Sequence, residues 1–80
     1  MITSAQIRAA RALLDWSREA LSNHSGIGIS ALMRLENASG IPGGNIKTFE
    51  AVQKTFENAG IEFIGTPDDG PGVRLHSAKT

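Results

Sequence analysis

Apolar side chains recur at intervals of three and four residues along most of the first 60 positions, which is the spacing of amphipathic helices. A first helix is predicted over 4–15, with Ser4 as a candidate N-cap. A later helix is predicted over 46–59, with Asn45 as its cap and Gly60 as its left-handed end. The apolar positions are Ile7, Ala10, Leu13 and Leu14 in the first helix, and Ile46, Phe49, Val52 and Phe56 in the later one. An aromatic stripe of this kind forms a core far more often than a cofactor pocket, so Phe49 and Phe56 are predicted to pack.

Two shorter helices joined by a tight turn are predicted between these, over 18–25 and 29–37. Ser17 is a candidate N-cap for the first, because its hydroxyl can accept an amide hydrogen that has no partner in the first turn. Gly26 can adopt the left-handed conformation that ends this helix and turns the chain. The apolar residues that would face inward are Leu21, Ile27, Leu32 and Leu35. This is the pattern of a helix-turn-helix unit, whose second helix would leave its outer side open to a partner.

Beyond the last helix the pattern changes to the alternation of β-strands. Short strands are predicted over 61–64 and 73–76, with a polar turn over 65–72 between them. A two-stranded ribbon is marginal by itself, so it needs a cover for its apolar face. The ribbon can lie on the helices of its own chain, or its open edge can pair with a second copy across a two-fold axis. The chain is therefore divided into a helical unit over 1–60 and a ribbon over 61–80.

The residues around the predicted turn follow a family pattern. They are Trp16, Ser17, Arg18, Glu19, Leu21, Ser22, Gly26, Ile27, Leu32, Leu35 and Glu36. At these positions the chain resembles the Xre/Cro-type, phage-repressor-like transcriptional regulators, and the resemblance covers roughly 3–60. It implies a mainly α fold, a small four- to five-helix helix-turn-helix domain, here followed by a C-terminal two-stranded β ribbon. It also implies a sequence-specific DNA-binding regulator, a repressor that reads two half-sites as a homodimer, and on that ground pairing through the ribbon is favoured.

The resemblance implies that the second helix of the unit enters the major groove of double-stranded DNA by its amino end. The residues presented to base edges are then Gly28, Ile29, Ser30 and Met33. Ile29 and Met33 suit the methyl groups of thymine. The Ser30 hydroxyl can donate or accept a hydrogen bond, so it discriminates only loosely between bases. The chain departs from the family at Gly28, where a capping serine or threonine is usual, and at Met33, where a polar base-reading residue is common.

Basic side chains near this unit are candidates for phosphate contacts. The residues assigned to phosphates are Arg18, Arg34 and Lys47. For Arg34, a surface ion pair with Glu36 or Glu57 is the alternative. For Arg8 and Arg11, which share one side of the first helix, a solvated surface is favoured over help with the phosphate backbone.

Charge does not single the chain out as a nucleic-acid binder, because its 80 residues carry a formal net charge of zero. Residues 1–47 hold five basic and three acidic side chains, and the remainder holds three basic and five acidic, so the basic excess lies in the helical unit. The neutral balance keeps an alternative open. In it the chain is an antitoxin-like or adaptor module of the same fold that grips a protein partner, such as a toxin, and binds DNA weakly.

Residues that carry chemistry are sparse. The chain has no cysteine, and His24 and His76 are its only histidines, with no spacing typical of a metal site. The glycine-rich stretch over 40–44 lacks the strand and the lysine of a phosphate-binding loop, and the adjacent Asp68 and Asp69 do not make a calcium loop. We therefore expect no enzyme, metal or cofactor. With no apolar run of about 18 residues, we expect a soluble, cytoplasmic protein without a membrane partner.

Overall fold

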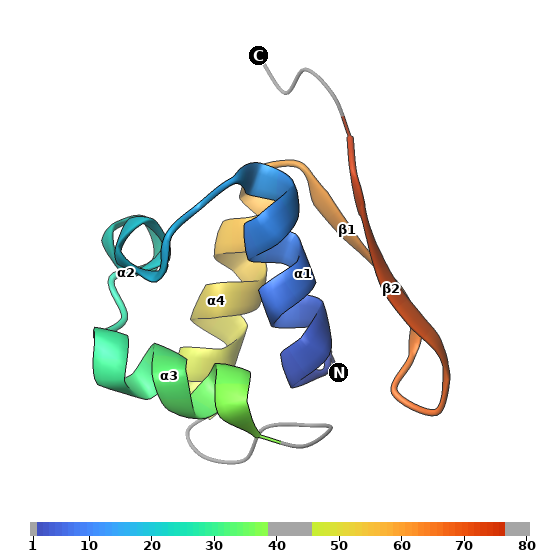
Figure 1. Cartoon of the computed structure of the whole chain (residues 1–80), viewed down its shortest axis with the longest axis horizontal. Coiled ribbons are helices and arrows are strands. Elements are labelled where there is room, and N and C mark those ends of the chain that lie inside the picture. The colour runs from blue at the N-terminus through green and yellow to red at the C-terminus, as the bar shows by residue number, and fades with distance from the viewer. Residues whose placement is uncertain (1, 39–45, 77–80) are drawn as a thin grey trace.

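Four helices precede a two-stranded antiparallel ribbon in the computed structural model, which describes residues 2–38 and 46–76 (Figure 1). The elements are α1 (Ser4–Leu14), α2 (Arg18–Ser25), α3 (Ile29–Asn37), α4 (Ile46–Asn58), β1 (Ile61–Thr66) and β2 (Asp69–Leu75). The predicted fold class, mainly α with a C-terminal ribbon, is confirmed. Both short helices of the predicted helix-turn-helix unit have the bounds that the sequence indicated.

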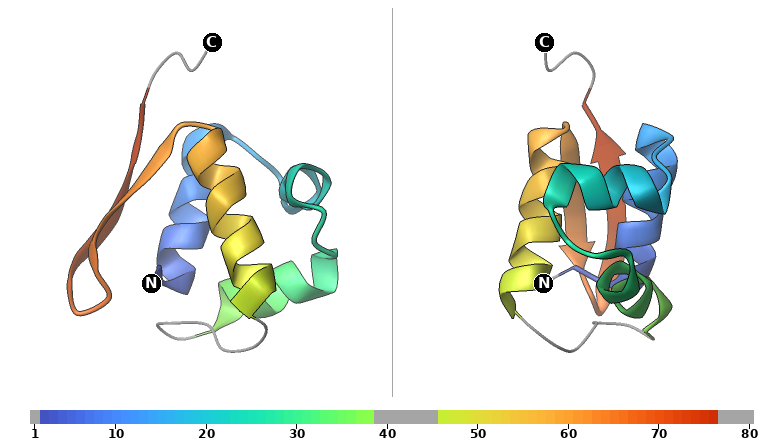
Figure 2. Two further views of the ribbon diagram at one scale, coloured as in Figure 1. Left: turned by 180° about the vertical axis from the view of Figure 1, so that it is seen from behind. Right: turned by 90° about the vertical axis from the view of Figure 1, so that its left-hand side faces the viewer.

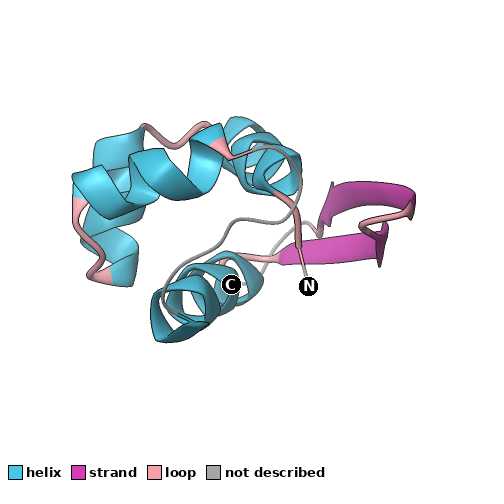
Figure 3. Ribbon diagram, turned by 90° about the horizontal axis from the view of Figure 1, so that it is seen from below, coloured by secondary structure: helices cyan, strands magenta, loops and turns pink. Residues whose placement is uncertain are grey.

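The elements lie in three layers. Helices α1 and α4 stand side by side in the middle, with α2 and α3 on one side of them and the ribbon on the other (Figure 2). Viewed from below, the two strands project from the end of the molecule opposite the α2–α3 corner (Figure 3). The ribbon and the α2–α3 corner therefore lie at opposite ends of the molecule.

The core gathers one apolar stripe from each helix and the first residue of β1. Its buried apolar members are Ile2, Ile7, Ala10, Leu21, Leu32, Leu35, Phe49, Val52, Phe56 and Ile61. Phe49 and Phe56 are buried, as predicted. Two other apolar positions of the predicted helices lie on the surface, since Leu13 is 44% exposed and Ile46 is 59% exposed. Leu13 belongs to the last turn of α1 and Ile46 begins α4, so both lie at helix ends beyond the packed middle of the stripe.

Thr3 caps the amino end of α1, and the prediction of Ser4 as the cap is wrong. Thr3 Oγ1 accepts from the Gln6 amide at 3.1 Å, and Gln6 Oε1 accepts from the Thr3 amide at 2.8 Å. This reciprocal pair is a capping box, in which glutamine at the third helical position completes the motif. The Ser4 hydroxyl donates instead to the Leu35 carbonyl at the end of α3.

The other predicted helix ends are largely confirmed. Ser17 Oγ accepts from the Ala20 amide at 3.0 Å, and Gly60 follows α4 with a φ of 103°. α4 ends at Asn58, one residue earlier than predicted. Its predicted cap, Asn45, and the glycine-rich stretch over 40–44 lie outside the described residues.

The strands of the ribbon are longer than predicted, and the turn between them is confined to 67–68. Pairing continues to Thr66 opposite Asp69 because the register shifts between Ile64 and Thr66. Gly65 makes the shift possible with a φ of 76°, a left-handed conformation that costs glycine little. The predicted polar turn over 65–72 is therefore wrong, since most of it is paired strand.

The ribbon lies on the helices of its own chain, one of the two arrangements considered. Phe63 and Val73 on its inner face pack against the core. Gln6 of α1 fastens both strands, because its Nε2 donates to the Ile64 carbonyl at 3.1 Å and to the Gly72 carbonyl at 2.8 Å. A second copy would therefore have to meet the ribbon at an edge or on its outer face.

We expect Gly65→Ala to destabilise the protein by at least about 1 kcal/mol, because the new side chain would be forced into a left-handed conformation. Its Cβ would also lie 2.2 Å from the Gly70 carbonyl oxygen. Urea unfolding followed by circular dichroism measures the change. The matched control is Gly72→Ala on the opposite strand, where a Cβ meets no heavy atom within 4 Å and φ is not positive. Equal losses for the two variants would contradict the proposed role of Gly65.

Candidate nucleic-acid interface

The corner between α2 and α3 is closed by local hydrogen bonds. Gly26 has a φ of 76°, and its amide donates to the Ser22 carbonyl at 2.8 Å. The Ser22 hydroxyl donates to the Ile27 carbonyl at 2.7 Å, and the Ile27 amide donates to Ser25 Oγ at 3.2 Å. The predicted turn glycine is thus confirmed, and two serines of α2 hold the turn in shape. Gly28 caps α3 without a side-chain hydrogen bond, as its lack of a hydroxyl requires.

The inward side of α3 is formed by Leu32, Leu35 and Glu36, which are at most 5% exposed. A helix turns by about 100° per residue, so the residues opposite this stripe are Ser30, Arg34 and Asn37. All three are exposed. Met33 lies to one side of them and is 42% exposed.

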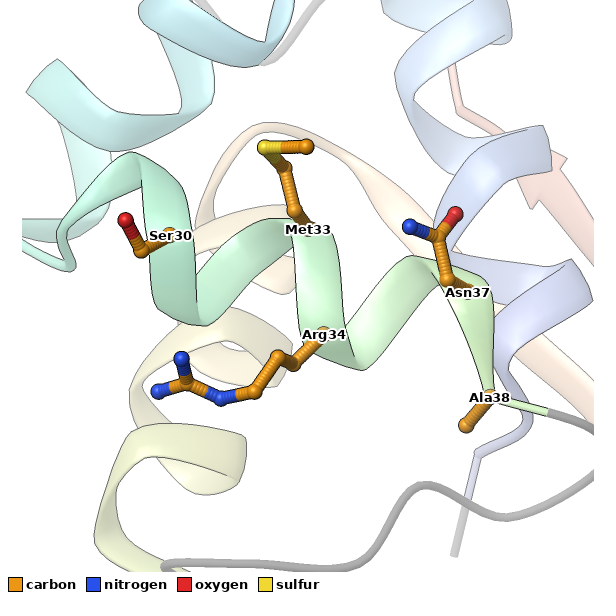
Figure 4. Close-up of a pocket in the computed structure, with 5 residues that line it drawn as sticks. All are labelled: Ser30, Met33, Arg34, Asn37 and Ala38. Atoms are coloured by element: carbon orange, nitrogen blue, oxygen red, sulfur yellow. The ribbon is translucent and has the colours of Figure 1, made fainter.

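These outward residues line a shallow hollow along α3. Figure 4 shows Ser30, Met33, Arg34 and Asn37 projecting from the helix, with Ala38 at its end. Ile29, in the first turn of the same helix, is 39% exposed. The five predicted residues on or next to α3, namely Gly28, Ile29, Ser30, Met33 and Arg34, are therefore accessible together.

The carboxylate of Glu36 is the one acidic group of α3, and it points into the protein with no exposed side-chain surface. Arg11 of α1 binds it with two hydrogen bonds, from Nη2 to Oε1 at 2.8 Å and from Nε to Oε2 at 3.0 Å. Arg18 of α2 donates from Nη2 to Oε1 at 3.2 Å. Three helices therefore meet at one buried carboxylate.

Burial alone would raise the pKa of Glu36, because a low dielectric disfavours the charged form. The hydrogen bonds and positive charges of Arg11 and Arg18 outweigh burial and hold the pKa below its ordinary value. The outward side of α3 consequently bears no carboxylate, and Arg34 is its only charged residue.

α1 also satisfies the free end of α3. The last carbonyls of a helix lack partners within it, and here Ser4 donates to the Leu35 carbonyl while Arg8 donates to the Glu36 carbonyl. Arg11 further donates to the Trp16 carbonyl at 3.0 Å. The interpretation of Arg8 and Arg11 as a solvated surface is confirmed only for the exposure of Arg8, since both arginines bind α3 and Arg11 is partly buried.

The cations assigned to phosphates differ in their surroundings. Arg18 turns its guanidinium towards Glu36, although its side chain is 33% exposed. Lys47 is exposed in the first turn of α4. Neither surface pair considered for Arg34 forms, because Glu36 is occupied by other arginines and Glu57 accepts from Gln53 at 3.2 Å.

Two features of the site were missed in the sequence. Asn37 shares the outward side with Ser30 and Arg34, and its spacing of seven and three residues from them is a signal that would have identified it. Glu36 was considered as a surface partner, although it follows Leu32 by four residues and so falls on the inward side.

Comparisons with protein-family models, with curated proteins and with solved structures found no match. Within residues 2–38 and 46–76, no group of three or more histidine, cysteine or acidic side chains is placed to hold a metal ion. No helix of this part is long and apolar enough to cross a membrane.

We expect Glu36→Gln to lower the free energy of unfolding by about 2 to 4 kcal/mol, because it leaves two guanidiniums without their counter-charge. The loss should fall below that of a fully buried pair, since Arg11 and Arg18 keep 21% and 33% of their side chains exposed. Chemical denaturation at pH 7 measures it. Glu57→Gln, on the surface of α4, is the matched control and should change stability by no more than about 0.5 kcal/mol.

Comparing wild type with Glu36→Gln at several pH values separates the contribution of the carboxylate charge from that of packing. Because folding lowers the pKa of Glu36, its carboxylate adds stability that is fully present above the ordinary value of 4.5 and is lost as pH falls through the folded-state value. Wild type should therefore lose more stability than Glu36→Gln when pH is lowered from 6 towards 3. Parallel pH profiles for the two would rule out a stabilising carboxylate.

Proposed function

We propose that the chain is a sequence-specific DNA-binding transcriptional regulator of the Xre/Cro type that acts as a repressor, with α3 as its recognition helix. The observation that carries the proposal is the accessible side of α3, on which Ser30, Arg34 and Asn37 project next to Met33. Hydroxyl, guanidinium and amide groups are those that read base edges, and a methionine side chain suits a thymine methyl group.

The shape and charge of α3 support this proposal. A helix is about 10–12 Å wide with its side chains, and the major groove is about 12 Å wide, so one helix fits. Glu36 is turned inward and compensated by two arginines, so the side offered to DNA carries a single positive charge and no negative one. The formal net charge of zero does not oppose binding, because the acidic excess lies in the later part of the chain.

Phosphate contacts are assigned to the elements that flank α3. The first helix of the unit would lie across the backbone, with the amide groups at the amino end of α2 directed at a phosphate. Arg18 would share its guanidinium between Glu36 and that phosphate. Lys47 in the first turn of α4 would supply another contact.

A homodimer is part of the proposal, because α3 alone reads too little DNA. Its nine residues span about 13 Å, the length of about four base pairs. Two copies related by a two-fold axis would read two half-sites, with a spacing of about 34–36 Å between their recognition helices.

The alternative is a protein-interaction module, antitoxin-like or an adaptor, for which α3 is the docking side. The exposed apolar residues Ile29 and Met33, at 39% and 42%, favour it. A toxin or other protein would then cover the surface that we assign to DNA.

Titration of labelled genomic fragments by fluorescence anisotropy at two salt concentrations tests DNA binding. We expect saturable binding that weakens as salt rises, with a log–log slope of about −0.9 per neutralised phosphate. Lys47→Ala should make this slope less steep by about one. Lys54→Ala, an exposed lysine further along α4, is the control and should leave the slope unchanged. If no fragment binds saturably at low salt, DNA is not the partner and the alternative is favoured.

Sedimentation equilibrium with and without DNA tests the homodimer. We expect a mass of twice 8.5 kDa for the protein in the complex, and a two-fold symmetric footprint on the bound fragment. One chain on an asymmetric footprint would contradict the dimer and leave the assignment of α3 intact.

A further inference from the structure

Arg34 differs from the other arginines of the structure in having nothing to bind. Arg8, Arg11 and Arg18 donate to acceptors of α3 or to Trp16, and Arg74 pairs with Glu62 at 3.2 Å. Among the described residues, Arg34 makes no hydrogen bond and no ion pair, although it is exposed on α3. A guanidinium has five donors in a fixed planar fork, all of them here available to an outside acceptor.

The place of Arg34 on α3 indicates which acceptor it meets. It lies opposite the buried stripe of Leu32, Leu35 and Glu36, one helical turn after Ser30 and almost one before Asn37. When a helix lies in the major groove, side chains on this central line face the base edges, whereas phosphate contacts come mainly from neighbouring elements. Figure 4 shows the long side chain of Arg34 lying alongside α3 and reaching back towards Ser30.

We propose that Arg34 is the main specificity-determining residue and reads a guanine in each half-site, donating two hydrogen bonds to its O6 and N7. The inference rests on the proposed function and replaces the phosphate contact that the family resemblance implied for Arg34. The fork of an arginine matches these two acceptors, which no other base presents as a pair in the major groove.

The neighbours of Arg34 agree with this role. No carboxylate lies on the outward side of α3 to compete for the guanidinium, because Glu36 is buried and occupied. Met33, on the flank, provides an apolar surface beside the guanine, where a thymine methyl group fits. The inferred half-site therefore contains a guanine next to thymine.

In vitro selection from a random duplex library tests the inference with the full chain. Wild type should select sites with one fixed guanine in each half, and Arg34→Ala should lose the preference at that position alone. Affinity of Arg34→Ala for the selected site should fall about 5- to 150-fold, with little change for a duplex in which that G·C pair is replaced by A·T. Arg34→Gln should shift the preference to adenine, because an amide pairs with adenine N6 and N7.

Two controls separate recognition from folding. Unfolding curves of both Arg34 variants should match wild type, because among the described residues the side chain makes no hydrogen bond or ion pair that the substitution would remove. Lys54→Ala should select the same sites as wild type.

Three results would overturn the inference. Two of them leave the proposed function standing, and the third overturns it as well. Uniform weakening of Arg34→Ala on all duplexes, with a salt slope less steep by about 0.9, would make Arg34 a phosphate contact and leave the proposed function standing. A wild-type consensus without a fixed guanine would do the same. If wild type enriches no sequence, both the inference and the proposed function fail.

Discussion

The arrangement of the helices depends on one buried carboxylate. Glu36 loses all contact with solvent, and an ionised carboxylate in that position is stable only when opposite charges and hydrogen bonds replace water. Arg11 supplies them from α1 and Arg18 from α2, so the ion pairs form only when three helices are correctly placed. They also fix the rotation of α3 about its axis. With Glu36 inward, Arg34 is necessarily outward, and the charge that holds the fold together thereby selects the side offered to a partner.

This arrangement also explains why net charge is a poor guide to the function of the chain. Of the four arginines in the helical unit, Arg11 and Arg18 form ion pairs with Glu36. Arg8 donates to the backbone carbonyl of the same residue. Formal charge counts these side chains as though all of them faced solvent. The accessible side of α3 has a net charge of one positive unit, which Arg34 contributes. The DNA binding that we propose would then depend on the placement of a few groups, as expected when base contacts specify and phosphate contacts position.

Most features set by neighbouring residues could be predicted from the sequence, although the Thr3–Gln6 cap of α1 was missed, and features set by distant residues could not. The bounds of α2 and α3 follow from Ser17 and Gly26, whose effects are local, so the corner was predicted to the residue. Arg11 and Glu36 lie 25 positions apart, and no local pattern reveals that they meet. The length of the ribbon was missed for a related reason, because the shift at Gly65 depends on the register of the partner strand.

The ribbon and the recognition helix are joined through α1, although they lie on opposite sides of the molecule. Gln6 fastens both strands to α1, and Arg11 of the same helix binds Glu36 of α3. One short helix thus bonds to the ribbon near its start and to α3 along its length. If two copies of the chain pair at their ribbons, their α3 helices are held at a defined separation through this connection. A weak or mobile ribbon would lose that geometry, so in the proposed dimer the hydrogen bonds of Gln6 would matter to the reading of two half-sites as much as the side chains of α3.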